Sequence, residues 1–204
     1  KILRESLVIL LSQKENIEVV GAAGDGQEAY RRILELKPDI AVLDISIPQL
    51  NGLDLAEKLR VELPQVKVVI LTMHKSGEFV SKALCAGVRG YVLKENAREE
   101  LIECIQLVAE RKIYLSQDIT GIVVDGFVNN NRENPESGES AVSPREREIL
   151  QLLAEGKSNK EVSDLLNLSI KTVETHRSNI MRKLGFRHIT DLVLYAVRNH
   201  MIEL

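Results

Sequence analysis

Short runs of apolar residues alternate with amphipathic stretches through the first half of the chain, and this alternation restricts the possible fold more than any other feature. Val, Ile and Leu dominate the runs Ile17–Gly21, Asp39–Leu43, Val66–Leu71 and Gly90–Leu93. Continuous apolar runs of this length are typical of strands that are buried on both faces. Because strands that alternate with helices form a parallel sheet between helical layers, we predict a doubly wound α/β domain over residues 1–113.

Between these runs, apolar residues recur every three or four positions, which is the spacing of amphipathic helices. This pattern predicts helices over Gln27–Lys37, Leu53–Val61 and Phe79–Ala86. A further helix is expected after Asn96, because Asn96 and Glu99 have the spacing of a capping box.

Residues 114–140 differ from their flanks in composition and are predicted to be a linker. Their net charge is −4, against −1 for residues 1–113 and +2 for residues 141–204. Ile119–Val128 predicts a short helix, whereas Asn129–Ser140 lacks Val, Ile, Leu and aromatic residues. A segment of that composition cannot bury enough apolar surface to order itself, so we expect a linker that is partly helical and then flexible.

Residues 141–204 carry the start and stop signals of four helices, so this domain is predicted to be all-α. Two Ser/Glu pairs have the spacing of capping boxes, a third serine precedes the third helix, and two glycines stand where helices should end: Ser143 with Glu146, Ser158 with Glu161, Ser169, Gly156 and Gly185. The fourth helix is expected to begin near Thr190. Asn167–Ser169 joins two short helices, the second of them basic and amphipathic, as in a helix-turn-helix.

Three polar residues close the predicted strands, namely Asp44, Thr72 and Lys94. Ligands of parallel sheets bind outside the carboxyl ends of the strands, so we expect these side chains to share one site. A carboxylate oxygen can accept a phosphoryl group as a nucleophile, and a hydroxyl and an ammonium can then bind phosphoryl oxygens. A lone Asp after a strand is more often a turn or capping residue. It is the combination of three that favours phosphoryl chemistry.

With these residues the first half of the chain resembles the receiver domain of two-component response regulators, which has a flavodoxin-like fold. The resemblance rests on Asp39–Asp44, the turn Pro48–Gly52, Leu71–Thr72 and Gly90–Lys94. It implies that Asp44 is the phosphoacceptor. The other residues to which it assigns roles are the switch residues Thr72 and Tyr91, the phosphoryl-contacting Lys94, and Ser46 and His74 as modulators of the phosphoryl lifetime.

The resemblance also implies Mg²⁺ as the cofactor of phosphorylation, held by Asp44 and the backbone carbonyl of Ser46. In the family, a strand before the first helix ends in an acidic pair that completes the metal site. The present chain begins at Lys1, already within that helix. We expect that the chain is clipped and that the first strand and the remaining acidic ligands are missing from it. The alternative is a receiver that has lost its metal site.

The helix expected over Lys171–Lys183 has a net charge of +3 and carries Glu174, Thr175 and Ser178 on its outer side. A basic helix with short polar side chains fits the major groove of DNA, where such side chains can reach base edges. Charge alone is explained equally well by a solvated helix face.

Three segments favour the nucleic-acid interpretation, because Ser143–Glu148, Gly156–Glu161 and Lys171–His176 closely resemble the LuxR-type DNA-binding domain. The resemblance spans residues 141–204. It implies that three residues of the basic helix face bases and that six residues face phosphates: Glu174, Thr175 and Ser178 for the bases, and Lys160, Ser169, Lys171, Thr172, Arg177 and Lys183 for the phosphates.

The same resemblance implies that Val173, Ile180 and Leu184 lie in the core and that His176 is half-buried. The last helix, around Asp191–His200, often pairs two such domains. Because one helix-turn-helix reads only a few base pairs, we expect a homodimer on two half-sites of double-stranded DNA.

Together these features predict a NarL/LuxR-type response regulator, a cytoplasmic transcription regulator rather than an enzyme. A sensor histidine kinase would phosphorylate Asp44 and thereby control DNA binding or dimerisation. One alternative is a phosphorylation-independent transcription factor whose receiver is an interaction module. Another is an aspartyl-phosphate phosphohydrolase, which would need a second acid where Ser46 stands. No membrane partner is expected, because no apolar run approaches the roughly 18 residues of a membrane-spanning helix.

Overall fold

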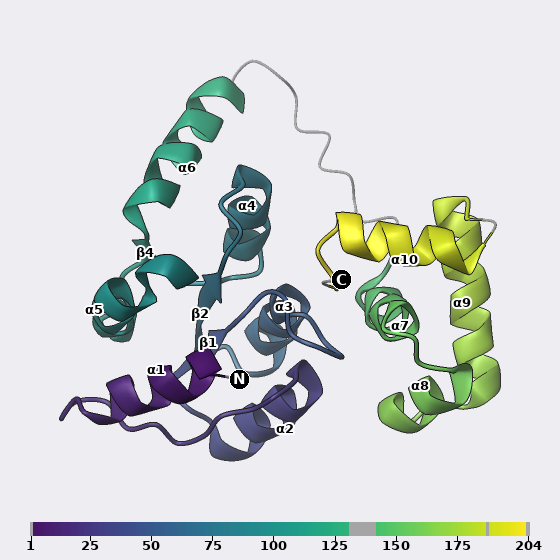
Figure 1. The fold of residues 1–204 in the computed structure, drawn as a ribbon, viewed down its shortest axis with the longest axis horizontal. Helices are drawn as coiled ribbons and strands as arrows, with labels where there is room; N and C mark the ends of the chain where they lie inside the picture. The colour runs from purple at the N-terminus through teal and green to yellow at the C-terminus, as the bar shows by residue number, and fades with distance from the viewer. Residues whose placement is uncertain (1, 131–141, 187, 203–204) are drawn as a thin grey trace. The chain divides into compact units, whose positions relative to one another are not determined.

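The computed structural model describes residues 2–130, 142–186 and 188–202 (Figure 1). Contacts between Cα atoms divide the chain into two compact units. The larger unit contains a sheet, and the smaller one contains the helices of the C-terminal part. The predicted domain boundaries at residues 113 and 140 stay predictions.

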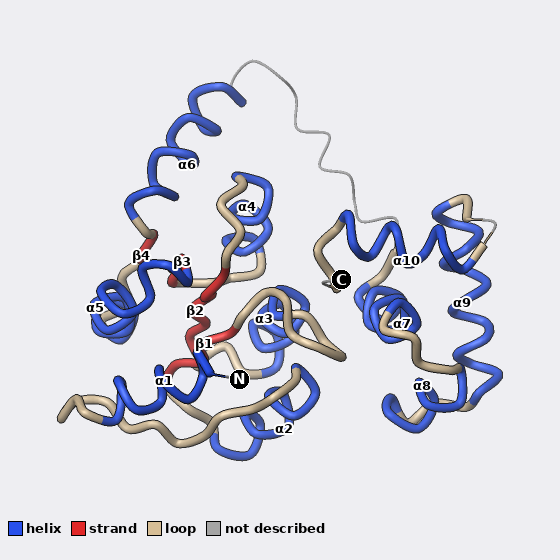
Figure 2. Tube along the Cα trace, viewed as in Figure 1, coloured by secondary structure: helices blue, strands red, loops and turns tan. Residues whose placement is uncertain are grey.

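The sheet has four strands in the order β1 (Ile40–Leu43), β2 (Lys67–Thr72), β3 (Gly90–Leu93) and β4 (Tyr114–Leu115), drawn in red in Figure 2. All three pairings are parallel. The predicted parallel sheet is therefore confirmed, and three of its strands coincide with predicted runs. β4 has only two residues, which is too short for a sequence pattern to indicate.

Helices lie on both sides of this sheet (Figure 1). The helices of the unit are α1 (Ile2–Ser12), α2 (Gly26–Leu36), α3 (Gly52–Glu62), α4 (Gly77–Cys85), α5 (Ala97–Ala109) and α6 (Gln117–Asn130). Val69 and Leu71 of β2 and Val92 of β3 are buried in one cluster with Leu101 and Val108 of α5. Continuous apolar strands of this kind are expected where helices cover both faces, and the doubly wound fold class is confirmed.

The prediction of a strand over Ile17–Gly21 was wrong. No strand is assigned to these residues, and β1 pairs only with β2. An apolar run becomes a strand only when a neighbouring strand takes up its backbone hydrogen bonds, and no strand in the described part of the chain does so here. Ile17 and Val19 instead pack their side chains against the core cluster beneath α5.

The capping box predicted for Asn96 and Glu99 is also absent, although α5 does follow Asn96. Residues Lys94–Asn96 form one turn of 3₁₀ helix (η1) that runs directly into α5. Asn96 therefore has φ −103° and ψ 7°, rather than the extended backbone of a capping residue, and its side chain makes no cap hydrogen bond. Its amide donates instead to Glu100, with an Nδ2–Oε1 distance of 3.0 Å.

The helix predicted over Ile119–Val128 is confirmed, because it lies within α6. Of the segment predicted to be flexible, Asn129 and Asn130 end this helix. Residues 131–140 lie outside the described residues.

The smaller unit contains α7 (Pro144–Ala154), α8 (Asn159–Leu166), α9 (Ile170–Leu184) and α10 (Ile189–Arg198). Both predicted capping boxes are present, at Ser143 and Ser158, and Ser169 accepts a hydrogen bond from the Thr172 N–H at the start of α9. The glycines that follow α7 and α9, Gly156 and Gly185, have positive φ angles of 84° and 68°, which is the conformation that favours glycine after a helix. The four predicted helices are confirmed.

The core of this unit joins all four helices through apolar side chains that are almost fully buried. They include Ile149 of α7, Val162 of α8, Val173 and Ile180 of α9, and Leu192 of α10. None of the helices found in the described residues is long and apolar enough to cross a membrane.

Gly52 gives the first testable prediction, because α3 begins where the backbone doubles back on the end of β1. A Cβ atom at Gly52 would lie 2.0 Å from the carbonyl oxygen of Asp44. This contact is with backbone and cannot relax cheaply, so Gly52→Ala should lower the free energy of unfolding by about 1–3 kcal/mol or more. Urea unfolding measures the change.

The matched control is Gly121→Ala in α6, where a Cβ atom would meet nothing within 4 Å. That variant should be neutral or more stable by about 0.5–1 kcal/mol, because alanine favours a helix over glycine. Equal stabilities for the two variants would contradict the close approach at Gly52.

Candidate functional site

Three of the predicted site residues stand at the carboxyl ends of adjacent strands. Asp44 directly follows β1, Thr72 ends β2, and Lys94 directly follows β3. The register aligns Leu43 with Ile70 and Thr72 with Leu93, so the three residues share one edge of the sheet. This edge is where parallel sheets bind their ligands.

Asp44 and Lys94 form an ion pair across this edge. The Lys94 Nζ lies 2.5 Å from the Asp44 Oδ2, and the two side chains are 22% and 25% exposed. The pair is therefore partly shielded from water, which strengthens its attraction, yet it stays accessible to an incoming group. The structure thus brings together the predicted carboxylate and the predicted ammonium.

Thr72 belongs to the strand between these two residues, and its side chain is fully buried. Its hydroxyl accepts a hydrogen bond from the backbone N–H of His74, with an N–Oγ1 distance of 3.2 Å. The hydroxyl is therefore bonded, as an acceptor, within the loop that follows β2. Its own O–H can still donate, and a rotation of the side chain toward a group held on Asp44 would lengthen or break the bond with His74.

Tyr91 of β3 is bonded to the same loop. Its ring is buried, and its hydroxyl donates to the carbonyl oxygen of His74 over 2.8 Å. Burial raises the pKa of the Tyr91 hydroxyl well above its usual value, so this group stays a neutral donor. The backbone of one residue, His74, is thus bonded at its N–H by Thr72 and at its carbonyl by Tyr91.

His74 and Ser46 both lie two residues beyond a strand-end site residue and are half-buried. The His74 ring stacks on Phe79 of α4, with ring centroids 4.7 Å apart. The ring is therefore partly held by packing. The predicted influence of both residues on a phosphoryl group stays a prediction.

The described residues contain no cluster of three or more His, Cys, Asp or Glu side chains that could hold a metal ion. The ligands that the resemblance implies are the Asp44 carboxylate and the Ser46 backbone carbonyl, both of them oxygen donors. Mg²⁺ prefers oxygen and is commonly held by one or two carboxylates, with water and substrate oxygens completing its shell. In donor chemistry these two groups fit Mg²⁺.

The second candidate site is the exposed face of α9. Its inner positions Val173 and Ile180 are buried, as predicted, and Leu184 packs against the same core. All three predicted base-facing residues, Glu174, Thr175 and Ser178, are exposed. The predicted half-burial of His176 is confirmed as well.

The residues predicted to face phosphates are exposed or half-buried. Lys160, Ser169 and Lys171 are exposed at the starts of α8 and α9, where the positive end of the helix dipole also favours an anion. The Thr172 hydroxyl lies 2.8 Å from the Ser169 Oγ, so these two hydroxyls are held at the turn between the helices.

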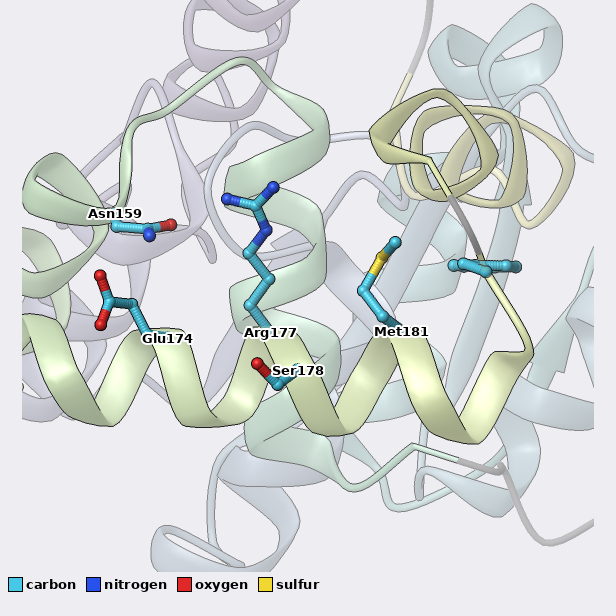
Figure 3. Close-up of a pocket in the computed structure, with 6 residues that line it drawn as sticks. Asn159, Glu174, Arg177, Ser178 and Met181 are labelled. Carbon is cyan, nitrogen blue, oxygen red and sulfur yellow. The ribbon is translucent and has the colours of Figure 1, made fainter.

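Beside α9 lies a hollow lined by residues of α8, α9 and the loop that follows α9. Its lining is Asn159, Glu174, Arg177, Ser178, Met181 and Phe186. Figure 3 shows the Asn159, Glu174 and Arg177 side chains on the same side of α9. The Asn159 Oδ1 is buried without a hydrogen-bond partner among the described residues. Sequence reasoning did not single out Asn159. Its place directly after the capping Ser158 was the only available signal.

Lys183 differs from the other predicted phosphate ligands, because its ammonium is engaged within the protein. Its Nζ lies 2.6 Å from the Oε2 of Glu146, and that carboxylate is only 5% exposed. The same carboxylate oxygen accepts the Ser143 N–H over 2.7 Å. Burial alone raises the pKa of Glu146, but the hydrogen bonds from Lys183 and Ser143 outweigh it and hold that pKa below its usual value. The pair thus ties the end of α9 to the start of α7.

Each half of the chain matches a known protein family. Residues 1–106 match the family described as response regulator receiver domain. Residues 140–196 match the family described as bacterial regulatory proteins, luxR family.

Among curated proteins, the oxygen regulatory protein NreC of Staphylococcus epidermidis (strain ATCC 12228 / FDA PCI 1200) is 36% identical over 207 residues, which cover 99% of this chain and 95% of that protein. Two solved structures are each 25% identical. The complex of the two-component response regulator RcsB with DNA has a TM-score of 0.58, with 96% of this chain and 93% of that chain covered. The structure of two RcsB dimers bound to two parallel DNAs has a TM-score of 0.57, with 96% and 92% covered.

The ion pair of Glu146 gives a prediction about pH. A carboxyl whose pKa is lowered in the folded state contributes stability above its unfolded pKa and loses that contribution as the pH falls through the folded pKa. Glu146→Gln should therefore cost about 1.5–3 kcal/mol at neutral pH. The difference from wild type should shrink as the pH falls below the ordinary value of 4.5. Urea unfolding, followed by NMR signals of the helical unit, measures both.

Glu161→Gln is the matched control, because Glu161 has the same place in the second capping box but is exposed. Its loss should be smaller at every pH. Equal losses for the two variants at neutral pH, or a Glu146→Gln deficit that persists in acid, would show that the ion pair with Lys183 does not stabilise this unit.

Proposed function

Because this chain belongs to the LuxR family of two-component response regulators, we propose that it is a transcription regulator whose DNA binding is controlled by phosphorylation of Asp44. The observation that carries the assignment of Asp44 is its ion pair with Lys94 at the carboxyl edge of the sheet. A sensor histidine kinase is the expected phosphodonor. Because promoter DNA is the proposed partner, we expect the protein to act in the cytoplasm.

In the transfer, an Asp44 carboxylate oxygen attacks the phosphorus of a phosphohistidine. The P–N bond breaks as the P–O bond to Asp44 forms, and the electron pair returns to the imidazole nitrogen, which takes up a proton from water. Mg²⁺ held by Asp44 and the Ser46 carbonyl would offset the repulsion between the carboxylate and the phosphoryl oxygens.

Phosphorylation adds negative charge at the place where Lys94 already binds. A phosphoryl group carries about −1.5 to −2 charges near neutral pH, so the Lys94 ammonium is drawn from the carboxylate oxygen to a phosphoryl oxygen. The Thr72 hydroxyl can turn to donate to a second phosphoryl oxygen, and this rotation would break its bond with the His74 N–H. The loop around His74 must then shift, and the hydrogen bond of Tyr91 to this loop couples the ring to the shift.

The size of these contacts is compatible with a switch. Hydrogen bonds to charged groups contribute about 1.5–3 kcal/mol each, so Lys94 and Thr72 together supply at most about 3–6 kcal/mol, because Lys94 exchanges one anionic partner for another. Moving an equilibrium from 1:99 to 99:1 requires about 5.5 kcal/mol of difference between the states. Two such contacts therefore reach the required range only if both form, which gives Thr72 and Lys94 comparable importance.

For DNA, we propose that α9 enters the major groove. Glu174, Thr175 and Ser178 would meet base edges there. The phosphate contacts would come from Lys160, Ser169, Lys171, Thr172, Arg177 and Lys183, the last of which would have to share its charge with Glu146. A homodimer would place two such helices on two half-sites, and the dimers in the RcsB–DNA structure support this arrangement.

The alternative of a phosphorylation-independent regulator is not favoured, because the receiver half matches its family and Asp44 is paired with Lys94. Family membership likewise supports a DNA-binding regulator over a phosphohydrolase.

Asp44→Asn tests the phosphoacceptor. The full chain should gain one phosphoryl group from acetyl phosphate in the presence of Mg²⁺, as measured by intact mass, and Asp44→Asn should gain none because its amide is no nucleophile. DNA affinity should rise with phosphodonor only in the wild type. Asp118→Asn, which changes an exposed carboxylate in α6, should be labelled like wild type. Labelling of Asp44→Asn at the wild-type level would refute the assignment.

Two variants test the division of α9 into phosphate-facing and base-facing residues: Lys171→Ala removes a proposed phosphate contact, and Thr175→Ala removes a proposed base contact. Loss of a phosphate contact should weaken binding to all sequences and flatten the log–log salt dependence by roughly one unit. Loss of a base contact should cost about 1–3 kcal/mol of discrimination at one base position and leave the salt dependence unchanged. Binding to a set of single-base operator variants at several salt concentrations separates the two, and identical behaviour of the variants would contradict the division.

A further inference from the structure

The first turn of α6 is fixed to the same sheet that carries the proposed phosphorylation site. Ser116, directly before α6, is fully buried, and its N–H donates to the carbonyl of Tyr91 over 3.0 Å. Its hydroxyl accepts the Leu93 N–H over 3.3 Å and donates to the Glu100 carboxylate. The Ser116 carbonyl in turn accepts the N–H groups of Ile119 and Thr120. The start of α6 is thereby fastened to β3.

Lys75 forms a second link to α6, from the loop that follows β2. Its ammonium contacts two carboxylates from different elements, Glu95 of η1 and Asp118 of α6, the latter with an Nζ–Oδ2 distance of 3.5 Å. The hydrogen bonds and charges of the two carboxylates raise the pKa of Lys75, and the hydrogen bond with Glu95 contributes most. Lys75 is therefore a charged bridge between the loop after β2, the turn after β3 and the first turn of α6.

The Lys75 bridge involves residues that directly follow residues of the proposed phosphorylation site. Lys75 is the next residue after His74, whose backbone is bonded by both Thr72 and Tyr91. Glu95 is the next residue after Lys94, which is paired with Asp44. Lys75 and Glu95 are therefore direct sequence neighbours of residues that would respond to a phosphoryl group on Asp44.

Apolar packing completes the contact between α6 and α4. A Cβ atom at Gly77, the first residue of α4, would lie 3.2 Å from the Ile122 Cγ2 of α6, so the two helices approach closely there. Ile119 of α6 is fully buried. Figure 1 shows α6 running beside α4, and the two helices are in contact.

We propose that Lys75 is a positioning residue that couples the phosphorylation site to α6, the helical first part of the predicted linker. In the unphosphorylated protein the Lys75 bridge holds the first turn of α6 against the loop after β2. When that loop and Glu95 shift, Lys75 loses its simultaneous contact with Glu95 and Asp118, and the first turn of α6 is loosened. This inference rests on the proposed function, since it names how the state of Asp44 reaches the linker.

Exposed ion pairs are individually weak, so the bridge biases the position of α6 and does not fix it alone. We therefore expect effects of a fewfold, with the Ser116 hydrogen bonds and the packing of Ile119 still in place. The appropriate readout is local opening of α6, because local opening responds to small changes that leave the whole fold intact.

Amide hydrogen exchange of the full chain, read on peptides that cover residues 117–123, tests the proposal. Without phosphodonor, Lys75→Met should raise the exchange rate about threefold or more over wild type, and Asp118→Asn should do the same from the other end of the bridge. Lys75→Arg should restore the wild-type rate because it keeps the charge. With acetyl phosphate and Mg²⁺, wild-type exchange should rise to the Lys75→Met level, and Lys75→Met should change little further.

Lys82→Met is the matched control. Lys82 forms an exposed ion pair of 2.7 Å with Glu78 on the same helix, and its side chain is 49% exposed against 48% for Lys75. Its ion pair and its contact with the Phe79 ring both lie within α4. It should exchange like wild type and keep the response to phosphodonor. Equal exchange in Lys75→Met, Lys82→Met and wild type would overturn the proposal, as would labelling of Asp44 that leaves α6 exchange unchanged.

Failure of this inference can be told from failure of the proposed function. If Asp44 is phosphorylated and DNA affinity responds while Lys75→Met behaves like Lys82→Met, the coupling role of Lys75 is refuted and the function stands. If no phosphoryl group is gained on Asp44, the proposed function and the coupling both fail, and faster exchange in Lys75→Met then reports only local stabilisation of α6.

Discussion

The parallel register of β1, β2 and β3 is the constraint on which the proposed chemistry depends. Because these strands run in the same direction and are neighbours, the residues that end them arrive at a single edge. A carboxylate, a hydroxyl and an ammonium reach this edge from three separate parts of the chain. The ion pair between Asp44 and Lys94 then places a positive charge beside the carboxylate that is to carry the negatively charged phosphoryl group. Neither charge would be useful without the register that brings them together.

The loop after β2 is where this edge meets the rest of the receiver unit. His74 is bonded at its N–H by Thr72 and at its carbonyl by Tyr91, and its ring stacks on Phe79. One residue further on, Lys75 reaches α6. A change at Asp44 therefore has a short physical route, through the four-residue loop between β2 and α4, to α6 in the predicted linker. In the helical unit, the ion pair between the buried Glu146 carboxylate and the exposed Lys183 side chain has a comparable structural role, since it fixes the end of α9 to the start of α7.

The sequence was most informative where local rules decide the structure. Capping boxes at Ser143 and Ser158 involve residues three positions apart, and both were predicted correctly. Long apolar runs gave three strands, but Ile17–Gly21 failed because a strand also needs a neighbour, which the run itself does not reveal. The capping box predicted at Asn96 does not form, because the turn before Asn96 continues into α5 and its backbone is not extended. For the site, strand ends identified Asp44, Thr72 and Lys94, whereas the contacts of Lys183 and Lys75 join residues distant in sequence and leave no pattern.

The most direct test of the central claim is a structure of the full chain with beryllofluoride, a tetrahedral stand-in for a phosphoryl group, bound to the Asp44 carboxylate in the presence of Mg²⁺. We expect the Lys94 Nζ and the Thr72 Oγ1 each to lie within about 3.2 Å of a fluorine atom, with the bond from the His74 N–H to Thr72 broken. A structure in which beryllofluoride occupies Asp44 while Thr72 still accepts the His74 N–H and Lys94 points elsewhere would contradict the claim.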